Sequence, residues 1–291
     1  MNVLYQLVLR NIRLFLRDKA SVFFSFLSVI IIIFMYVLFL GKMQENSLSE
    51  AYNNVEGIDW LVSSWIMAGI LTVSTVTVPL SAIGTLIDDR YKGVLDDFYT
   101  SPIDRKILSL GYLVSAWVIA IMMVSINFII GQIYVVIMGG EILGFFSTIK
   151  LLGAVLLSIM TFSSLFFYIS LFMKTQNAFG TLATLVGTFI GFLGGIYIPI
   201  GAMGKNVQTV MNILPSAHSV TLIRNIYMES AIDKVFSGAP AGVLEDYSFM
   251  FGLEVNIGNY LLSPFHLVLS LAVFGLFFYG LSVYKLSKSK L

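Results

Sequence analysis

Two pairs of adjacent aspartates are the side chains in this sequence with the clearest potential for chemistry. Asp88-Asp89 and Asp96-Asp97 lie in one short charged segment. Paired carboxylates can hold Mg²⁺, and a membrane prenyltransferase uses such ions to bind a diphosphate. Neither pair has a further carboxylate at helical spacing on another apolar stretch, and neighbouring Lys and Arg residues offer ordinary surface ion pairs. A magnesium-dependent membrane enzyme is therefore an alternative that the sequence supports weakly.

Other residue types that carry chemistry are sparse. His218 and His266 are far apart in the chain with no carboxylate pattern around them, the 13 Met are scattered, and the chain has no Cys. Without thiols there is neither a disulfide framework nor a Cys-based metal site. The two Gly-Lys pairs lack the rest of the phosphate-binding GxxxxGK[ST] loop. The sequence thus predicts no catalytic residues, no metal site and no ATPase site in this chain.

Long apolar stretches make up most of the chain. Of its 291 residues 58% are hydrophobic and 11% are charged, and the mean hydropathy is +0.91, which is typical of a polytopic membrane protein. About 20 apolar residues in a helix span the hydrocarbon core. We therefore predict an all-α membrane protein with six transmembrane helices. The uncharged stretches that give them are 20–41, 60–87, 107–140, 151–173, 175–204 and 255–284.

The distribution of Lys and Arg predicts the orientation. Twelve of the 17 basic residues lie in the N-terminal segment, in the segment after the second predicted helix, at Lys174 and in the C-terminal tail. The positive-inside rule places both termini and residues 88–106 in the cytoplasm. The net charge of +1 gives no indication of a nucleic-acid partner.

Residues 1–19 predict an amphipathic helix that lies in the membrane interface. Arg10, Arg13 and Arg17 fall on one narrow arc of a helix, and Leu and Phe side chains cover the rest. Such a helix binds the lipid surface. The alternative is an ordinary solvated N-terminal helix.

Residues 88–106 predict a short amphipathic helix beneath the membrane. Asp88 and Asp89 suit the N-terminal end of this helix. The helix should end at Ser101, because the residue before a proline avoids helical geometry. Ser101 and Pro102 would then be the N-cap and the first residue of the next helix. No other part of the sequence is an obvious cover for its apolar stripe, which suggests a soluble partner. The stripe consists of Tyr91, Val94, Leu95 and Phe98.

The predicted membrane helices contain no ionisable side chain that could couple transport to a proton or a cation. A transporter built from this chain would therefore take its energy from another subunit. A stand-alone channel or a secondary carrier is the alternative.

The stretch DDRYKGVLDDFYTSPIDRKILSLGYLVSAW resembles the cytoplasmic segment of type-two ABC transporter permeases, the membrane subunits of bacterial drug, antibiotic, toxin and polysaccharide exporters. A second stretch, LPSAHSVTLIRNIY, resembles the Leu-Pro segment of this family and its following Arg, here Pro215 and Arg224. The residues of the first stretch that fit the family pattern in order are Asp88, Asp89, Arg90, Gly93, Leu95, Ser101, Pro102 and Arg105.

The resemblance implies one permease domain over residues 1–291, with 88–106 as the coupling segment and 200–261 as an extracytoplasmic, re-entrant segment. Two such chains, identical or paralogous, would pair with two separate ATPase subunits that bind ATP and Mg²⁺, in a bacterial cell membrane. The coupling helix, 88–100, would dock on the ATPase. The hydroxyl-rich helices and the lack of buried charge favour an amphipathic or lipid-like cargo over a small ion.

Two predicted helices carry candidate pathway or packing residues. Hydroxyl groups at helical spacing either line the export path or bond back to carbonyls of their own helix, and these are Ser74, Thr77, Ser81 and Thr85. Small residues four apart allow close helix packing, within the chain or across a dimer, and these are Gly187, Gly191 and Gly195.

The segment between the last two predicted spans is broken by glycines and by Pro215, which favours re-entrant helices over a loop that lies on the surface. Residues 229–254 carry five acidic residues and one Lys. We expect this acidic segment to cap the exit of the path or to contact a cargo. The alternative is a tolerated insertion, because long loops cost little entropy to close.

Overall fold

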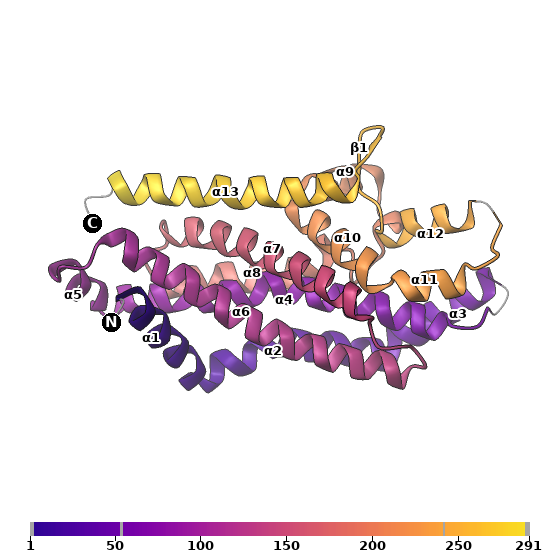
Figure 1. Ribbon diagram of the computed structural model, residues 1–291, viewed down its shortest axis with the longest axis horizontal. Helices are drawn as coiled ribbons and strands as arrows, with labels where there is room; N and C mark the ends of the chain where they lie inside the picture. Colours follow the sequence, from indigo (N-terminus) through magenta and orange to yellow (C-terminus); the bar gives the residue numbers. More distant parts are fainter. Residues whose placement is uncertain (1–2, 53–54, 241, 289–291) are drawn as a thin grey trace.

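Long helices run side by side along one axis, and short helices gather at one end of them (Figure 1). The computed structural model describes residues 3–52, 55–240 and 242–288. The first elements are α1 (Val3–Arg17), α2 (Lys19–Met35), the π-helix η1 (Tyr36–Leu40), α3 (Gly41–Ala51), α4 (Ile58–Tyr91), α5 (Val94–Thr100), α6 (Arg105–Ile137) and α7 (Phe145–Ser170). They are followed by α8 (Gln176–Leu193), the 3-10 helix η2 (Ile200–Ala202), α9 (Lys205–Ile213), α10 (Pro215–Tyr227), α11 (Glu229–Val235), α12 (Val243–Phe251), β1 (Asn256–Ile257), β2 (Tyr260–Leu261) and α13 (Pro264–Lys288).

Within the described residues, five helices are long and apolar enough to cross a membrane: α4, α6, α7, α8 and α13. A sixth span is obtained if α1 and α2, which meet at a bend of 79°, are counted as one. The prediction of an all-α membrane protein is confirmed, with five or six spans. The first predicted span is longer than the sequence suggests, because the helix that begins at Lys19 continues through η1 and α3 to Ala51.

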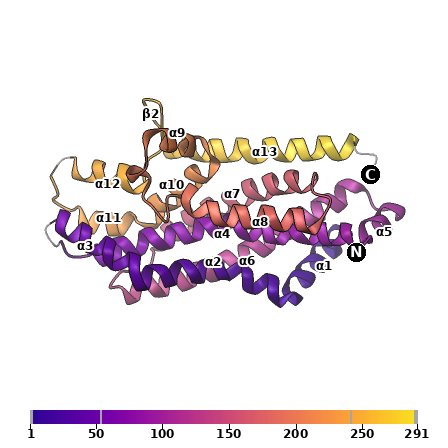
Figure 2. The ribbon, with the colours of Figure 1, turned by 180° about the vertical axis from the view of Figure 1, so that it is seen from behind.

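Helix α4 forms the centre of the bundle. It is apolar around its whole circumference and is buried along almost all of its length, as expected for such a helix. It packs against α6, α7, α10, α8 and α2. In contrast, α8 and α13 leave most of their surface exposed, and Figure 2 shows α8 alongside α4 on the face turned away from the view of Figure 1. Helix α4 is therefore enclosed by its neighbours along most of its length, while α8 has an exposed face.

The two ends of the bundle differ. The start of α1 and the end of α13 lie toward α5, at what we call the α5 end, whereas α3, α11 and α12 lie at the opposite end, the α12 end (Figure 1). A two-stranded antiparallel hairpin, β1–β2, pairs Asn256 with Leu261 and projects beside α9. Pro215 is the first residue of α10, where its missing N–H costs nothing.

The boundaries around the charged segment differ from the prediction. Asp88 and Asp89 lie in the last turn of α4, since that helix continues to Tyr91. Gly93, with a left-handed φ of +75°, terminates it two residues later. The next helix, α5, starts only at Val94. The two aspartates therefore do not begin the coupling helix.

Ser101 and Pro102 do not start the third span either. The Ser101 hydroxyl donates to the carbonyl of Phe98 (2.7 Å), so Ser101 closes the end of α5. Asp104 is the N-cap of α6, because its carboxylate accepts the backbone N–H of Lys106 at 2.8 Å. Helix α6 therefore starts three positions later than predicted, at the cap that Asp104 provides.

The three glycines of the predicted packing face do not share one helix. Helix α8 ends at Leu193, and Gly195 lies in the turn that follows, with a φ of +59°. A Cβ at Gly191 would overlap the ring of Tyr197, and a Cβ at Gly195 would overlap Ile200. Both glycines therefore make room for the residues after α8 rather than for another long helix.

Candidate functional site

A buried carboxylate at the α5 end joins three helices. Arg10 of α1 donates from Nη1 and Nη2 to the two carboxylate oxygens of Asp89 at 2.7 and 2.8 Å. The hydroxyl of Tyr112 in α6 donates to the same carboxylate at 2.5 Å. Asp89 is only 4% exposed, so its charge depends on these donors. The contacts fasten α1 and α6 to the end of α4.

The short helix α5 is attached to the same group. The guanidinium of Arg10 lies over the ring of Phe98, 5.4 Å from its centroid, in a cation–π contact. We call Arg10, Asp89, Phe98 and Tyr112 the coupling cluster. It links α1, α4, α5 and α6.

The apolar stripe of α5 is largely covered by the chain itself. Leu95 is buried, and Val94 and Phe98 are half-buried. The prediction that the stripe stays free for a partner is therefore wrong for Leu95, because α5 folds back onto the bundle. The exposed residues around α5 are Tyr91, Lys92, Asp96, Asp97 and Thr100.

Helix α1 presents a buried face to α6. Leu7 and Asn11 are buried, Asn11 donates to the hydroxyl of Ser115 at 3.2 Å, and a Cβ at Gly111 would lie 3.0 Å from Leu7. Arg13 and Arg17 are exposed, whereas Arg10 points inward. The three arginines of the predicted cationic arc therefore have different surroundings. Residues 1–2 of the predicted interfacial helix lie outside the described part.

Arg90, next to the cluster, holds the end of α4 against α7. Its Nη1 donates to the carbonyls of Ser170 (3.3 Å) and Met173 (2.6 Å), at and just after the C-terminal end of α7. A cation is favourable there because the carbonyl end of a helix carries partial negative charge. Arg105, the last basic residue of the predicted motif, lies over the ring of Tyr99 at 5.1 Å.

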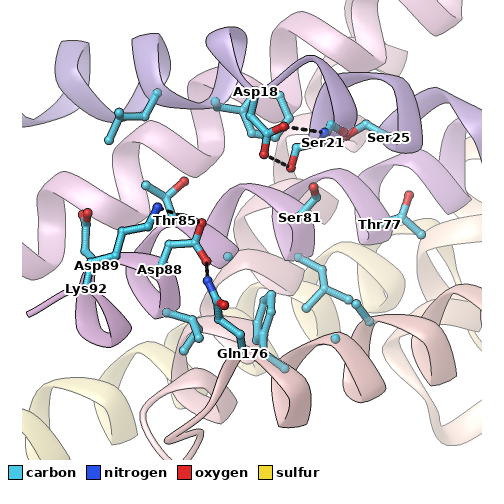
Figure 3. A pocket seen from close by; sticks show the side chains of 18 of the residues that line it. Asp18, Ser21, Ser25, Thr77, Ser81, Thr85, Asp88, Asp89, Lys92 and Gln176 are labelled. Carbon is cyan, nitrogen blue, oxygen red and sulfur yellow. Dashed lines mark hydrogen bonds and ion pairs between the residues drawn. The ribbon is translucent and has the colours of Figure 1, made fainter.

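A cleft of about 960 Å³ lies between α1, α2, α4 and α8 (Figure 3). Small residues of α4 and α8 leave the space open, among them Gly84, Gly180 and Gly187. Its lining is rich in hydroxyl groups from three helices, and these belong to Ser21, Ser25, Thr77, Ser81, Thr85 and Thr184.

Charged side chains surround the part of the cleft nearest the α5 end. Gln176 of α8 donates to Asp88 at 2.5 Å, and Lys92 lies 3.9 Å from the same carboxylate. On the other side, Asp18 caps α2 by accepting from the N–H groups of Ala20 and Ser21 and from the Ser21 hydroxyl at 2.6 Å. The hydroxyl of Ser21 is the main reason why the pKa of Asp18 lies below its usual value. The mouth is thus ionic and the interior carries hydroxyls.

The predicted pathway residues divide between this cleft and the core. Thr77, Ser81 and Gly187 line the cleft. Ser74 does not, because it is fully buried, donates to the carbonyl of Ile70 and accepts from Asn127 at 2.9 Å. Thr77 also donates to Val73, at 3.1 Å, so a hydroxyl can line the cleft and still bond to its own helix.

Some residues of the cleft, and the pairing of Arg10 with Asp89, are not apparent in the sequence. Asp18, Gln176 and Thr184 meet at the cleft only because α2 and α8 pack beside α4, and Arg10 and Asp89 are 79 positions apart. An inward Arg on an amphipathic helix carries no local signal. Among the described residues, no group of three or more His, Cys, Asp or Glu side chains is placed to hold a metal ion.

A bundle of apolar, membrane-length helices beside a polar cleft defines an integral membrane protein. The family model described as ABC-2 type transporter matches residues 2–228. Since this is more than half of the chain, the chain belongs to the ABC-2 type transporter family and is a membrane subunit of an ABC transporter. No curated protein matches the chain. The match confirms the resemblance found around residues 88–105 and 214–227, and the acidic segment 229–254 lies beyond it.

Proposed function

We propose that this chain is the permease subunit of an ATP-driven exporter and that the cleft is its transport path. The observation that carries the proposal is a hydroxyl-lined cleft between α2, α4 and α8, with its charged mouth at the α5 end, in a chain of the ABC-2 family. The α5 end and both termini face the cytoplasm of a bacterial cell, as the distribution of basic residues indicates. ATP and Mg²⁺ bind to a separate ATPase subunit.

The lining favours an amphipathic cargo. Hydroxyl groups and glycines offer weak polar contacts without a fixed charge inside the cleft, while acidic and basic side chains stand at its mouth. A cargo with a polar head and an apolar body can leave water at such a mouth and move along the hydroxyls. A small ion would need charged or carbonyl ligands along its route.

A second permease chain covers the free face of α8. Thr181, Thr184 and Thr188 are exposed on one face of this spanning helix, and small or hydroxyl side chains are typical of faces where membrane helices pack. The adjoining face exposes large apolar side chains that suit lipid, namely Leu185, Phe189 and Phe192. A homodimer or a pair of paralogous chains would join the two clefts into one path.

The ATPase docks on the exposed side of α5 rather than on its apolar stripe. Asp96 and Asp97 lie exposed in the first turn of α5, beside Tyr91, which is 68% exposed. Movement of α5 then reaches α1, α4 and α6 through the coupling cluster, because Phe98 and Asp89 both contact Arg10. This is how hydrolysis in one subunit would change the shape of the cleft in another.

A charge-reversal experiment tests the docking. The double variant Asp96→Arg/Asp97→Arg should reduce co-purification of a P-loop ATPase and the ATP hydrolysis of the purified complex at least tenfold. Glu245→Arg/Asp246→Arg is the matched control, since it reverses an exposed acidic pair in the first turn of another short helix, α12, at the opposite end. Equal ATPase association and hydrolysis in the two double variants would contradict the proposed docking face.

A further inference from the structure

Arg224 in α10 is a completely buried cation whose charge is balanced by carbonyl groups. Its Nη1 donates to the carbonyl of Phe251 at 2.9 Å, and its Nη2 donates to the carbonyl of Gly195 at 3.0 Å. The guanidinium also lies over the ring of Trp65, 4.6 Å from its centroid. None of the ion pairs formed by the described residues includes Arg224. Phe251 ends α12 and Gly195 follows α8, so the cation bridges the negative ends of two helices.

The end of α12 is held by further donors from α4 and α10. The indole N–H of Trp65 donates to the carbonyl of Phe251 at 2.8 Å. The Thr221 hydroxyl donates to Gly252 at 3.0 Å, and the Asn225 amide donates to Leu253 at 2.8 Å. Three successive carbonyls near the end of the acidic segment are therefore bound inside the protein. The last turn of α12 is part of the packed bundle rather than a loose loop.

The other partner of Arg224, Gly195, belongs to the turn that follows α8. Ile196, next to Gly195, is fully buried, and its carbonyl accepts from the hydroxyl of Tyr36 at the end of α2. A Cβ at Gly69 of α4 would lie 2.9 Å from Ile196. Helices α2, α4 and α8, which line the cleft, thus meet at Ile196.

This turn lies on the α12 side of the cleft, beyond its lining residues. The lining residues nearest the α12 end are Ser25, Thr77 and Gly187. At a rise of about 1.5 Å per residue, Gly69 lies about 12 Å beyond Thr77 along α4, and Tyr36 lies about 16 Å beyond Ser25 along the helix that begins as α2. Ile196 follows the end of α8 at Leu193. A route from the cleft to the α12 end between these helices would therefore pass Ile196.

We propose that Arg224 latches the outer exit of the transport path. It ties the turn with Ile196 to the end of α12, so the exit opens only when the contact with Gly195 or with Phe251 breaks. The inference rests on the proposed function of the cleft as a transport path, and it gives residues 229–254 a role in closing the exit. Arg224 acts through Gly195 and is a positioning residue for the exit.

Two glycines offer a matched pair of changes. A Cβ at Gly252 would lie 2.7 Å from Nη1 of Arg224, and Gly252 has a left-handed φ of +70°. Gly258, in the β1–β2 hairpin, has a similar φ of +62° but open space around it. Alanine strains the backbone in a similar way at both positions. Only Gly252→Ala pushes α12 away from Arg224.

The absence of cysteine from the chain permits a direct accessibility experiment. Thr77→Cys places a single thiol in the cleft, and a membrane-impermeant maleimide is added to either side of vesicles that contain the complex with its ATPase. In this parent we expect labelling from the α5 side only. Adding Gly252→Ala should raise the labelling rate from the α12 side at least tenfold, and adding Gly258→Ala should leave it unchanged. Arg224→Gln should act like Gly252→Ala. If Arg224→Gln does not accumulate in the membrane, the glycine pair decides.

The outcomes distinguish a failure of the proposed latch from a failure of the proposed transport path. Labelling of the parent from the α5 side, with equal rates from the α12 side for the two glycine variants, overturns the latch and leaves the cleft as the path. Failure of the parent thiol to react from the α5 side overturns both, because the cleft would then not open to the cytoplasm.

Discussion

Arg10→Gln is the change that probes the coupling cluster most directly. It leaves the carboxylate of Asp89, whose side chain is 6% exposed, without a cation, while the hydroxyl of Tyr112 still donates to it. Removing one partner of a buried ion pair costs about 3–5 kcal/mol. The lower value applies here, since the side chain of Arg10 is 30% exposed and water can replace part of its contact. We expect a loss of about 3 kcal/mol in the free energy of unfolding.

Thermal unfolding of the purified chain in detergent measures this loss. At roughly 2–4 °C per kcal/mol, the unfolding midpoint should fall by about 6–12 °C. Arg13→Gln is the control, because Arg13 is an exposed arginine on the same helix, and exposed charges contribute at most about 1 kcal/mol. The double variant Arg10→Gln/Asp89→Asn should be more stable than Arg10→Gln alone, since a neutral amide tolerates burial better than an unpaired carboxylate. Equal midpoints for Arg10→Gln and Arg13→Gln, or strictly additive effects in the double variant, would refute the argument.

Two further predictions concern the cleft and the helix boundaries. Gly180→Leu and Gly187→Leu should each narrow the cleft and lower the export rate while the ATPase still associates. Gly153→Leu is the control and should not lower export, because Gly153 also has open space around it but lies on α7, outside the cleft. Equal export by all three variants would exclude the cleft as the path. Asp104→Ala should lower the free energy of unfolding by about 1 kcal/mol through loss of the α6 N-cap, and a greater loss in Ser101→Ala would restore the boundary predicted from the sequence.

The membrane helices and the family follow from local patterns. Uncharged stretches of more than 20 residues can hardly be anything but spans, and the ordered motif from Asp88 to Arg105 is short and continuous in the chain. These features need no knowledge of which helices touch. They account for the agreement on the helical class and on the ABC-2 family.

Boundaries and burial depend on contacts that the chain order does not reveal. In the sequence, Asp89 resembles a residue at the start of a surface helix. In the structure it lies in the last turn of α4, because that helix continues until the left-handed Gly93 interrupts it. Leu95 looks like part of a free stripe, yet α5 folds back and buries it. Gly195 continues the glycine spacing, but α8 has already ended at Leu193.

The transport site is the least predictable part for the same reason. Ser74 and Thr77 share one hydroxyl stripe, but they are separated by about 60° around the helix axis and by about 4.5 Å along it. This difference is enough for Ser74 to face Asn127 while Thr77 faces the cleft. The role of Arg224 depends on the carbonyls of Gly195 and Phe251. Because every residue has a backbone carbonyl, the residue types do not identify these two as its partners. A polar stripe therefore indicates that one face of a helix differs from the others, but it does not show which residues or cavity that face contacts.

The central claim is that ATP hydrolysis by a partner subunit changes access to the cleft of this chain. The measurement that tests it most directly is the maleimide labelling rate of Thr77→Cys from the α5 side, in vesicles that hold the permease with its ATPase. The rate is compared without nucleotide and after hydrolysis of ATP in the presence of vanadate, which traps ADP and vanadate in the ATPase. The account predicts that trapping lowers this rate at least tenfold, and that the Asp96→Arg/Asp97→Arg change abolishes the difference. A labelling rate that is the same in the untrapped and the vanadate-trapped state, in a complex that hydrolyses ATP, would contradict it.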